Sequence, residues 1–146
     1  MINKKNFISY GKNVYDKLEI NAVLKTLKKS TQMGQAVNSF ESKIAPLFGK
    51  KYGLMVNSGS SALILAFKVL NLKKNSEVIA PCLNFGTAVS SIMLSNLKPI
   101  FVDCEIETLQ IDINKIEEKI TKKTKALLIP NLIGNIPDWK EIRRIA

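Results

Sequence analysis

Four short apolar runs, separated by segments that suit helices, constrain the fold of this chain most strongly. The runs are Leu54 to Val56, Glu77 to Ala80, Pro99 to Val102 and Ala126 to Ile129. Between them, residues 62–70, 87–94 and 112–120 carry apolar side chains at spacings that predict packed helices. Strands that alternate with helices in this way are typical of βαβ units and a parallel sheet. Because the runs are uniformly apolar, we expect an α/β fold, with a mainly parallel sheet and helices on both of its faces.

Two amphipathic segments precede this pattern and predict a helical N-terminal segment in front of the α/β region. The first helix is expected over Val14 to Lys29, and the second follows Gly34 and ends at Gly49. We therefore place the domain boundary between residues 1–50 and residues 51–146.

The last two helices of the chain are expected to start at clear signals. Asp112 should cap the third crossover helix, with Ile113, Ile116 and Ile120 facing inward, and a final helix should start around Pro137. A further strand would normally follow that helix in an alternating α/β chain. We therefore expect the sequence to be a piece of a longer protein; a complete small domain is the alternative.

The turn from Ser58 to Ser61 is the first candidate binding site. It joins the expected strand at 54–56 to an apolar helix, so several backbone N–H groups should point at one spot, where the helix dipole adds partial positive charge. Such a turn holds a phosphate or carboxylate well, and Gly59 lets a ligand approach the backbone closely. The alternative is that the serines cap a buried helix and do nothing more.

The loops that follow the other strands are also candidates, because ligands in open parallel sheets bind beyond the carboxyl ends of the strands. Phe85, between Asn84 and Gly86, could cover the flat face of a heteroaromatic ligand; alternatively it is an ordinary core residue. A phosphate site and a stacking aromatic together would fit a phosphorylated planar cofactor. The polar residues in the later loops are expected to order turns: Asp103, Asn131 and Asn135.

Composition excludes several classes of function. The formal net charge is +10, but 20 of the 22 basic residues are scattered lysines, which disfavours nucleic-acid recognition and favours a general attraction to anionic substrates. Histidine is absent, which removes Ser-His and Cys-His nucleophile pairs, and we expect no metal site. Cys82 and Cys104 are expected in the core of a reduced, cytoplasmic protein, and neither a signal peptide nor a membrane span is visible.

As a set, the strand-end motifs resemble a known family, the PLP-dependent sugar aminotransferases of the DegT type, which have the aspartate-aminotransferase fold (fold type I). The motifs that carry the resemblance are Asn57-Ser58-Gly59-Ser60-Ser61-Ala62, Glu77 to Pro81, Asn84-Phe85, Pro99 to Asp103, Thr121 to Ala126 and Gly134-Asn135. The resemblance implies that the chain is the N-terminal part of the large domain and that the cofactor is pyridoxal 5'-phosphate (PLP). It further implies that Gly59, Ser60 and Ser61 hold the cofactor phosphate and that Phe85 stacks on the pyridine ring.

Other parts of the family's machinery are not matched in this sequence. The family uses an aspartate that pairs with the pyridinium nitrogen and a lysine that forms the aldimine with PLP. No lysine here occupies the matching position, so we nominate no catalytic residue and expect the chain alone to be inactive. Gly134-Asn135 is a departure, because the aminotransferases commonly have Gly-Gln there. The pair is similar to the related PLP-dependent sugar 3-dehydratases, in which histidine replaces the lysine.

The leading hypothesis is therefore that this chain is part of a PLP-dependent aminotransferase. The enzyme would act on a nucleotide-linked keto-sugar with an amino-acid donor, in deoxyamino-sugar and polysaccharide biosynthesis. The resemblance also implies a homodimer. Within the family, the alternative is the sugar 3-dehydratase. Outside the enzyme class, the alternative is a non-catalytic, basic binding or regulatory module that has kept this fold.

Overall fold

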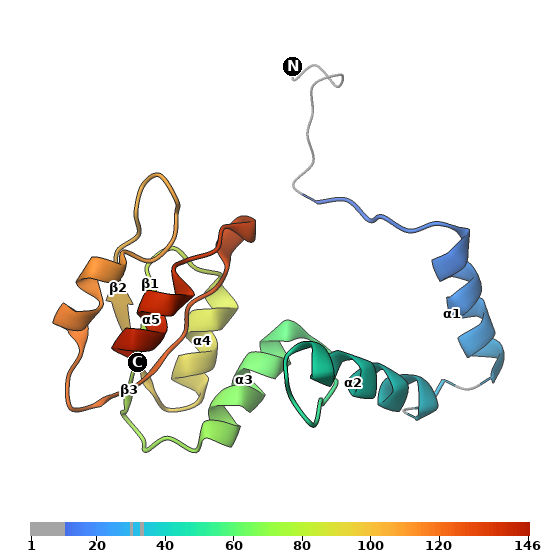
Figure 1. Ribbon diagram of the computed structural model, residues 1–146. Coiled ribbons are helices and arrows are strands. Elements are labelled where there is room, and N and C mark those ends of the chain that lie inside the picture. The colour runs from blue at the N-terminus through green and yellow to red at the C-terminus, as the bar shows by residue number, and fades with distance from the viewer. Residues whose placement is uncertain (1–10, 30, 33) are drawn as a thin grey trace, which may run out of the picture. The chain divides into compact units, whose positions relative to one another are not determined.

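The computed structural model describes residues 11–29, 31, 32 and 34–146, and its contacts divide the chain into two units (Figure 1). The first unit ends at Met55, and the second runs from Val56 to Ala146. Residues 1–13, which the sequence predicts to be irregular, lie largely outside the described residues. No helix of the described part combines the length and the apolar character needed to cross a membrane.

The first unit contains two helices, α1 (Lys17–Lys29) and α2 (Gln35–Leu47). Helix α1 starts later than predicted because Asp16 forms a capping box with Glu19: its Oδ1 accepts from the Leu18 N–H at 2.7 Å, and its own N–H donates to Glu19 Oε2 at 2.9 Å. At the other end of this unit, Gly49 takes a φ of +63°, as expected for a glycine just after a helix.

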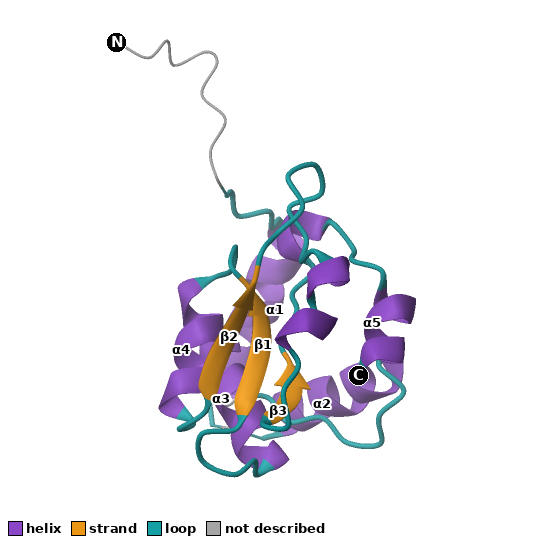
Figure 2. Ribbon diagram, turned by 90° about the vertical axis from the view of Figure 1, so that its left-hand side faces the viewer, coloured by secondary structure: helices purple, strands orange, loops and turns teal. Residues whose placement is uncertain are grey.

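The second unit is built on a three-stranded parallel sheet (Figure 2). Its strands are β1 (Glu77–Pro81), β2 (Lys98–Val102) and β3 (Thr124–Leu127), in the order β2-β1-β3. In the register, Ile79 lies opposite Ile100 of β2 and Leu127 of β3. The α/β class, the parallel sheet and three of the four expected strands are thus confirmed, with β3 starting two residues early.

The prediction of a fourth strand, over 54–56, is wrong. This segment has no regular structure and Leu54 is exposed. Its backbone is engaged with α2 instead: the Met55 N–H donates to Glu41 Oε1 at 2.7 Å, and a Cβ on Gly53 would come within 3.0 Å of the Glu41 carbonyl oxygen. A strand needs a neighbouring ladder for these groups, and none of the three strands in the described residues pairs with this segment.

Helices α3 (Gly59–Leu70), α4 (Gly86–Leu94) and α5 (Trp139–Ile145) flank the sheet. The first begins three residues before its predicted start. The last begins after Asp138, whose Oδ1 accepts from the N–H groups of Lys140 and Glu141 at 3.0 and 3.1 Å, so the prediction of a start around Pro137 was slightly early.

The predicted helix over 112–120 is instead a pair of 3₁₀ turns, η2 (Ile113–Lys115) and η3 (Glu117–Lys119). Asp112 caps the first turn as expected, accepting from the Asn114 N–H at 3.2 Å. With three residues per turn, Ile113 and Ile116 share one side and pack inward, whereas Ile120 falls off that side and is 43% exposed. The inward position of Ile120 was therefore predicted wrongly.

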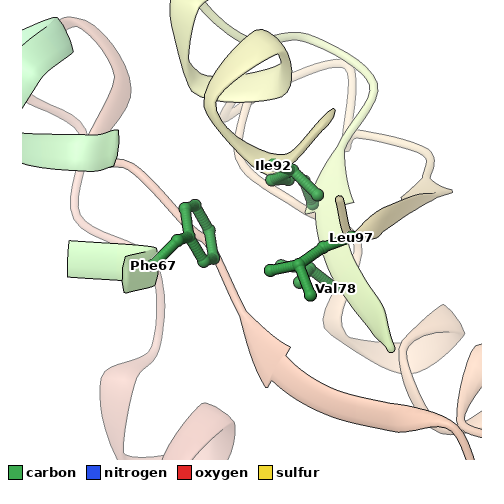
Figure 3. Packing of buried hydrophobic residues seen from close by; sticks show 5 residues of the cluster. Phe67, Val78, Ile92 and Leu97 are labelled. Carbon is green, nitrogen blue, oxygen red and sulfur yellow. The ribbon is translucent and has the colours of Figure 1, made fainter. Parts of the chain in front are cut away.

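Each face of β1 carries its own hydrophobic cluster. Val78 and Ala80 pack with Phe67 of α3 and with Ile92 and Leu97, as Figure 3 shows for the labelled members. On the opposite face Ile79 packs with residues from β2, the following loop and α5: Val102, Ile111, Ile116 and Ile142. The expected cover on both faces is thus confirmed for the central strand, while the two outer strands are partly exposed.

Candidate functional site

Helices α3 and α4 both begin at the edge of the sheet where β1 ends. Helix α3 leads into β1 and α4 leaves it, so both run opposite to the strand, and they pack against each other through Phe67 and Ile92. Their N-termini therefore lie at the carboxyl edge of the sheet, where open α/β sheets bind ligands. Gly59 starts α3 and Gly86 starts α4, so the fold brings the Ser58–Ser61 turn and the Phe85 loop to this one edge.

The serine turn is an N-cap that leaves amide donors unused. Ser58 has extended backbone (φ −162°, ψ 159°), and its Oγ accepts from the Ser61 N–H at 3.1 Å. The Ser58 carbonyl accepts from the Ala62 N–H at 3.1 Å, as in a normal helix. The N–H groups of Gly59 and Ser60 donate to no atom of the described residues. Ser58 therefore does cap the helix, as the alternative expects. The cap uses only the Ser61 N–H and leaves the N–H groups of Gly59 and Ser60 for an anion.

The space above Gly59 is open. A Cβ built on this glycine would meet nothing within 4 Å, so no protein atom requires a glycine at the position. A ligand can therefore approach the backbone at Gly59 without meeting protein atoms. Ser60 and Ser61 are half-buried, and the Ser61 hydroxyl receives a hydrogen bond from Ser58 Oγ at 3.1 Å, which leaves its own proton available. These features fit a phosphate group.

Phe85 is not a core residue, so that alternative is wrong. It is 70% exposed and occupies the N-cap position of α4 with extended backbone. Asn84 fixes this conformation, since its Oδ1 accepts from the Phe85 N–H at 2.8 Å. The Nδ2 atom of Asn84 is buried and has no acceptor among the described residues. An exposed aromatic ring at the ligand-binding edge is consistent with a surface for a planar group.

Polar side chains tie together the loops that follow β2 and β3. Asn135 Nδ2 donates to the Thr108 carbonyl at 2.7 Å, and Gln110 Nε2 donates to the Leu132 carbonyl at 3.2 Å. Asn131 Oδ1 accepts from Trp139 Nε1 at 2.9 Å. The asparagines thus order turns, as expected.

Sequence reasoning missed Gln110, which is 5% exposed, because a lone glutamine between two apolar residues gives no sign of a partner 22 positions away. Asp103 likewise orders its turn, accepting from the Cys104 N–H at 2.8 Å. The expectation that both cysteines lie in the core is wrong: Cys82 is exposed and Cys104 is half-buried, because both follow strand ends and face loops.

No nominated site residue carries a titratable side chain, so the attraction for an anion comes from amide dipoles at the start of α3. In the segment that follows β2, Asp112 and Lys115 form an ion pair, with Lys115 Nζ 3.0 Å from Asp112 Oδ2. The hydrogen bond from Lys115 lowers the pKa of Asp112, and the same bond raises the pKa of Lys115. Among the described residues, no group of three or more acidic or cysteine side chains is placed to hold a metal ion.

Comparison with known proteins decides the family. The sequence model of the DegT/DnrJ/EryC1/StrS aminotransferase family matches residues 13–146. The chain belongs to this family. Among curated relatives of this family, it is 38% identical over 140 residues to GDP-4-keto-6-deoxy-D-mannose 3-dehydratase of Escherichia coli O55:H7, covering 91% of this chain and 36% of that protein. It is 37% identical over 113 residues to GDP-perosamine synthase of Escherichia coli O157:H7, covering 77% of this chain and 31% of that protein.

Solved structures of the DegT/DnrJ/EryC1/StrS family share the fold. The structure of the E. coli 3-dehydratase with bound hydrated PLP superimposes with a TM-score of 0.85 at 37% identity, covering 92% of this chain and 36% of that one. The fold is therefore that of the PLP fold type I enzymes, and the family is PLP-dependent. The chain spans about a third of the length of these relatives. They include both sugar aminotransferases and a sugar 3-dehydratase.

Proposed function

We propose that this chain supplies the cofactor-phosphate site of a PLP-dependent enzyme that modifies a nucleotide-linked keto-sugar, in the first place an aminotransferase with an amino-acid donor. The observation that carries the proposal is the pair of unpaired N–H groups at Gly59 and Ser60, with open space beside Gly59, in a member of a PLP-dependent family. Products of such enzymes are used in deoxyamino-sugar and polysaccharide biosynthesis. The whole enzyme is expected to be a homodimer.

Each nominated residue has one task in this proposal. The amides of Gly59 and Ser60 and the hydroxyls of Ser60 and Ser61 donate to the phosphate oxygens, while Ser58 holds the turn in shape through the Ser61 N–H. The exposed ring of Phe85 would hold the flat face of the cofactor and shield it from water. When bound, PLP supplies an electron sink for bonds at the substrate carbon. The chain's own residues bind and orient the cofactor, and no proton transfer is assigned to them.

The 3-dehydratase is the second candidate. It is supported by Gly134-Asn135, which is similar to the dehydratases at a position where aminotransferases commonly have Gly-Gln, and by 38% identity to the E. coli 3-dehydratase. Sequencing the gene beyond the codon for Ala146 separates the two activities. A lysine at the position that bonds PLP supports the aminotransferase, and a histidine there supports the dehydratase.

The cofactor site can be tested on this chain with a ligand that cannot react with its lysines. 4'-Deoxypyridoxine 5'-phosphate keeps the ring and phosphate of PLP and lacks the aldehyde. We expect it to bind and to shift the backbone amide NMR signals of Gly59 and Ser60, whereas pyridoxine, without the phosphate, should bind far more weakly. The absence of any shift at Gly59 to Ala62 would contradict the proposal.

Substitution of the glycine sharpens this test. Gly59→Pro removes one of the two unpaired N–H groups, and proline is well tolerated at the first position of a helix after an extended residue such as Ser58. We expect about a tenfold loss of affinity for the phosphate ligand, the size of one charge-assisted hydrogen bond. Ser90→Ala, on the exposed side of α4, is the control and should bind normally.

The non-catalytic alternative makes a different prediction. A basic binding module with this fold would bind DNA in a strongly salt-dependent manner and would not distinguish the phosphate ligand from pyridoxine. Electrophoretic mobility of a DNA fragment at two salt concentrations, measured with the same protein sample, tests this directly.

A further inference from the structure

A hollow lies at the edge of the sheet opposite the proposed cofactor site. Its volume is about 470 Å³, within the range of small-molecule sites. It is formed where β1 and β2 begin, together with the turns that precede β1, β2 and β3. Three lysines line it, with one carboxylate and an apolar wall: Lys74, Lys98, Lys123, Glu77, Met93, Leu97 and Pro99.

Backbone hydrogen bonds hold the lysine-bearing segments together. The Asn75 N–H donates to the Asn96 carbonyl at 2.9 Å, and the Lys98 N–H donates to the Ser76 carbonyl at 2.9 Å. The Glu77 N–H donates to the Lys123 carbonyl at 2.8 Å. Lys74, Lys98 and Lys123 therefore come from three segments whose backbones are fixed against one another.

The positive charge of this hollow is only partly compensated. The Glu77 side chain is 8% exposed, and its Oε2 is occupied by hydrogen bonds from Thr121 Oγ1 at 2.6 Å and Thr124 Oγ1 at 3.5 Å. Its Oε1 lies 3.9 Å from Lys98 Nζ, a loose contact, because the Lys98 side chain is 63% exposed. Lys74 and Lys123 have no acidic partner among the described residues. Three lysines thus line a hollow whose single carboxylate already accepts two hydrogen bonds.

We infer that this hollow, the lysine pocket, binds a small organic molecule that carries a diphosphate or a similar cluster of negative charge. Lysine is a strong point-charge partner for phosphate. Met93, which is 62% exposed, and Pro99 offer an apolar surface beside the charges for the organic part of the ligand. The site is distinct from the one at Gly59, because the two lie at opposite ends of β1.

Amide NMR of the labelled chain at low ionic strength tests the inference, with inorganic pyrophosphate as the first probe. We expect shifts at the amides of residues 74–76 and 96–98. Lys74→Gln and Lys123→Gln should each weaken binding about fivefold, the upper range for an exposed ion pair. Lys140→Gln removes the same charge from the exposed surface of α5 and should leave the affinity unchanged.

The second probe is ADP, which adds a ring and a sugar to the same diphosphate. We expect ADP to shift the NMR signals of the same amides and also the methyl signal of Met93. Pyrophosphate should not shift the Met93 methyl signal. Exclusion of ADP from the pocket would contradict binding of an organic ligand there.

Two further outcomes would overturn the inference. Equal loss of affinity in Lys140→Gln would mean that the net charge of the chain attracts the anion diffusely. Shifts confined to Gly59–Ala62 would mean that pyrophosphate binds only at the cofactor site. Gly59→Pro separates the two sites, because it should weaken the shifts at the start of α3 and leave those of the lysine pocket unchanged.

Discussion

The hydroxyl of Thr121 donates a hydrogen bond of 2.6 Å to Oε2 of Glu77, 44 positions earlier in the chain. This bond fixes the turn before β3 to the first residue of β1 and satisfies a carboxylate that is almost wholly buried. A buried charge that loses a donor keeps its desolvation cost, so the bond should matter for stability.

Thr121→Val keeps the shape of the side chain and removes both the donor to Glu77 and the acceptor of the Lys123 N–H. We expect the free energy of unfolding to fall by about 1–3 kcal/mol, the usual cost of an unsatisfied buried group. Denaturant unfolding followed by the fluorescence of Trp139 measures this, since it is the chain's single tryptophan and lies in the second unit. Thr87→Val is the matched control, because the Thr87 hydroxyl makes no hydrogen bond within the described residues; an equal loss in both variants would contradict the assignment.

Ile92→Ala tests the cluster between the sheet and helices α3 and α4. Ile92 is fully buried, so its truncation should cost about 2–5 kcal/mol through lost apolar contact and the cavity left behind. Ile106 is 92% exposed, and Ile106→Ala should change stability by less than about 0.5 kcal/mol. Both are measured by the same unfolding experiment, and comparable losses would argue against the packing described.

Ser58→Ala separates capping from ligand binding. Ser58 is the N-cap of α3, so its loss should lower stability by about 1 kcal/mol. Ser60→Ala removes a hydroxyl that makes no hydrogen bond within the described residues and should leave stability nearly unchanged while weakening binding of the phosphate ligand. Thermal unfolding with and without 4'-deoxypyridoxine 5'-phosphate reports both effects; the reverse pattern would show that the roles are exchanged.

Arg144 predicts a pH dependence of stability. Its Nε donates to Glu141 Oε1 at 2.7 Å and its Nη2 lies 2.9 Å from Glu117 Oε1, which links α5 to η3. The hydrogen bond from Arg144 lowers the pKa of Glu141 below its usual value of 4.5. Because the folded-state pKa is depressed, the stabilisation is fully present above pH 4.5 and is lost as the pH falls through the lower, folded-state value.

The variant Arg144→Met should therefore be less stable than the parent chain near neutral pH and converge with it in acid. Unfolding curves between pH 7 and pH 3 give the difference directly. Arg143→Met removes the same charge from a residue without an ion pair in the described part of the chain and should show no such convergence. A difference that stays constant with pH in Arg144→Met would rule out Glu141 as its source.

Short stretches of the sequence predicted the strands and helix starts that depend on neighbouring residues alone. The apolar runs predicted β1, β2 and β3, and small or acidic residues predicted the starts of α3, α4 and η2 to within a few positions. Residues 54–56 were predicted wrongly because a strand depends on a neighbour that the sequence does not reveal, and here the Met55 N–H is bonded to Glu41 instead.

The candidate site was predictable in position more than in detail. The serines indicated that a helix starts here. Only the hydrogen bonds of the structure show that Ser58 accepts from the Ser61 N–H and that the N–H groups of Gly59 and Ser60 stay unpaired. Apolar character alone favoured a buried Phe85, whereas its place ahead of α4 exposes it. The partner of Glu77 could not be predicted, because nothing near it in the sequence points to Thr121.

Successive side chains of β1 point to opposite faces of the sheet, and this limits where the chain can gain or lose residues in evolution. Inserting one residue in the middle of 77–81 would send Ala80 to the side occupied by α5 and pull the remaining strand out of step with both neighbours. The turn over 105–109 is less restricted, since Ile106 at its tip is open to water and, within the described residues, only the Thr108 carbonyl is bonded to the later loop, through Asn135. Natural variants of this protein should therefore differ in length at that turn and never inside the central strand.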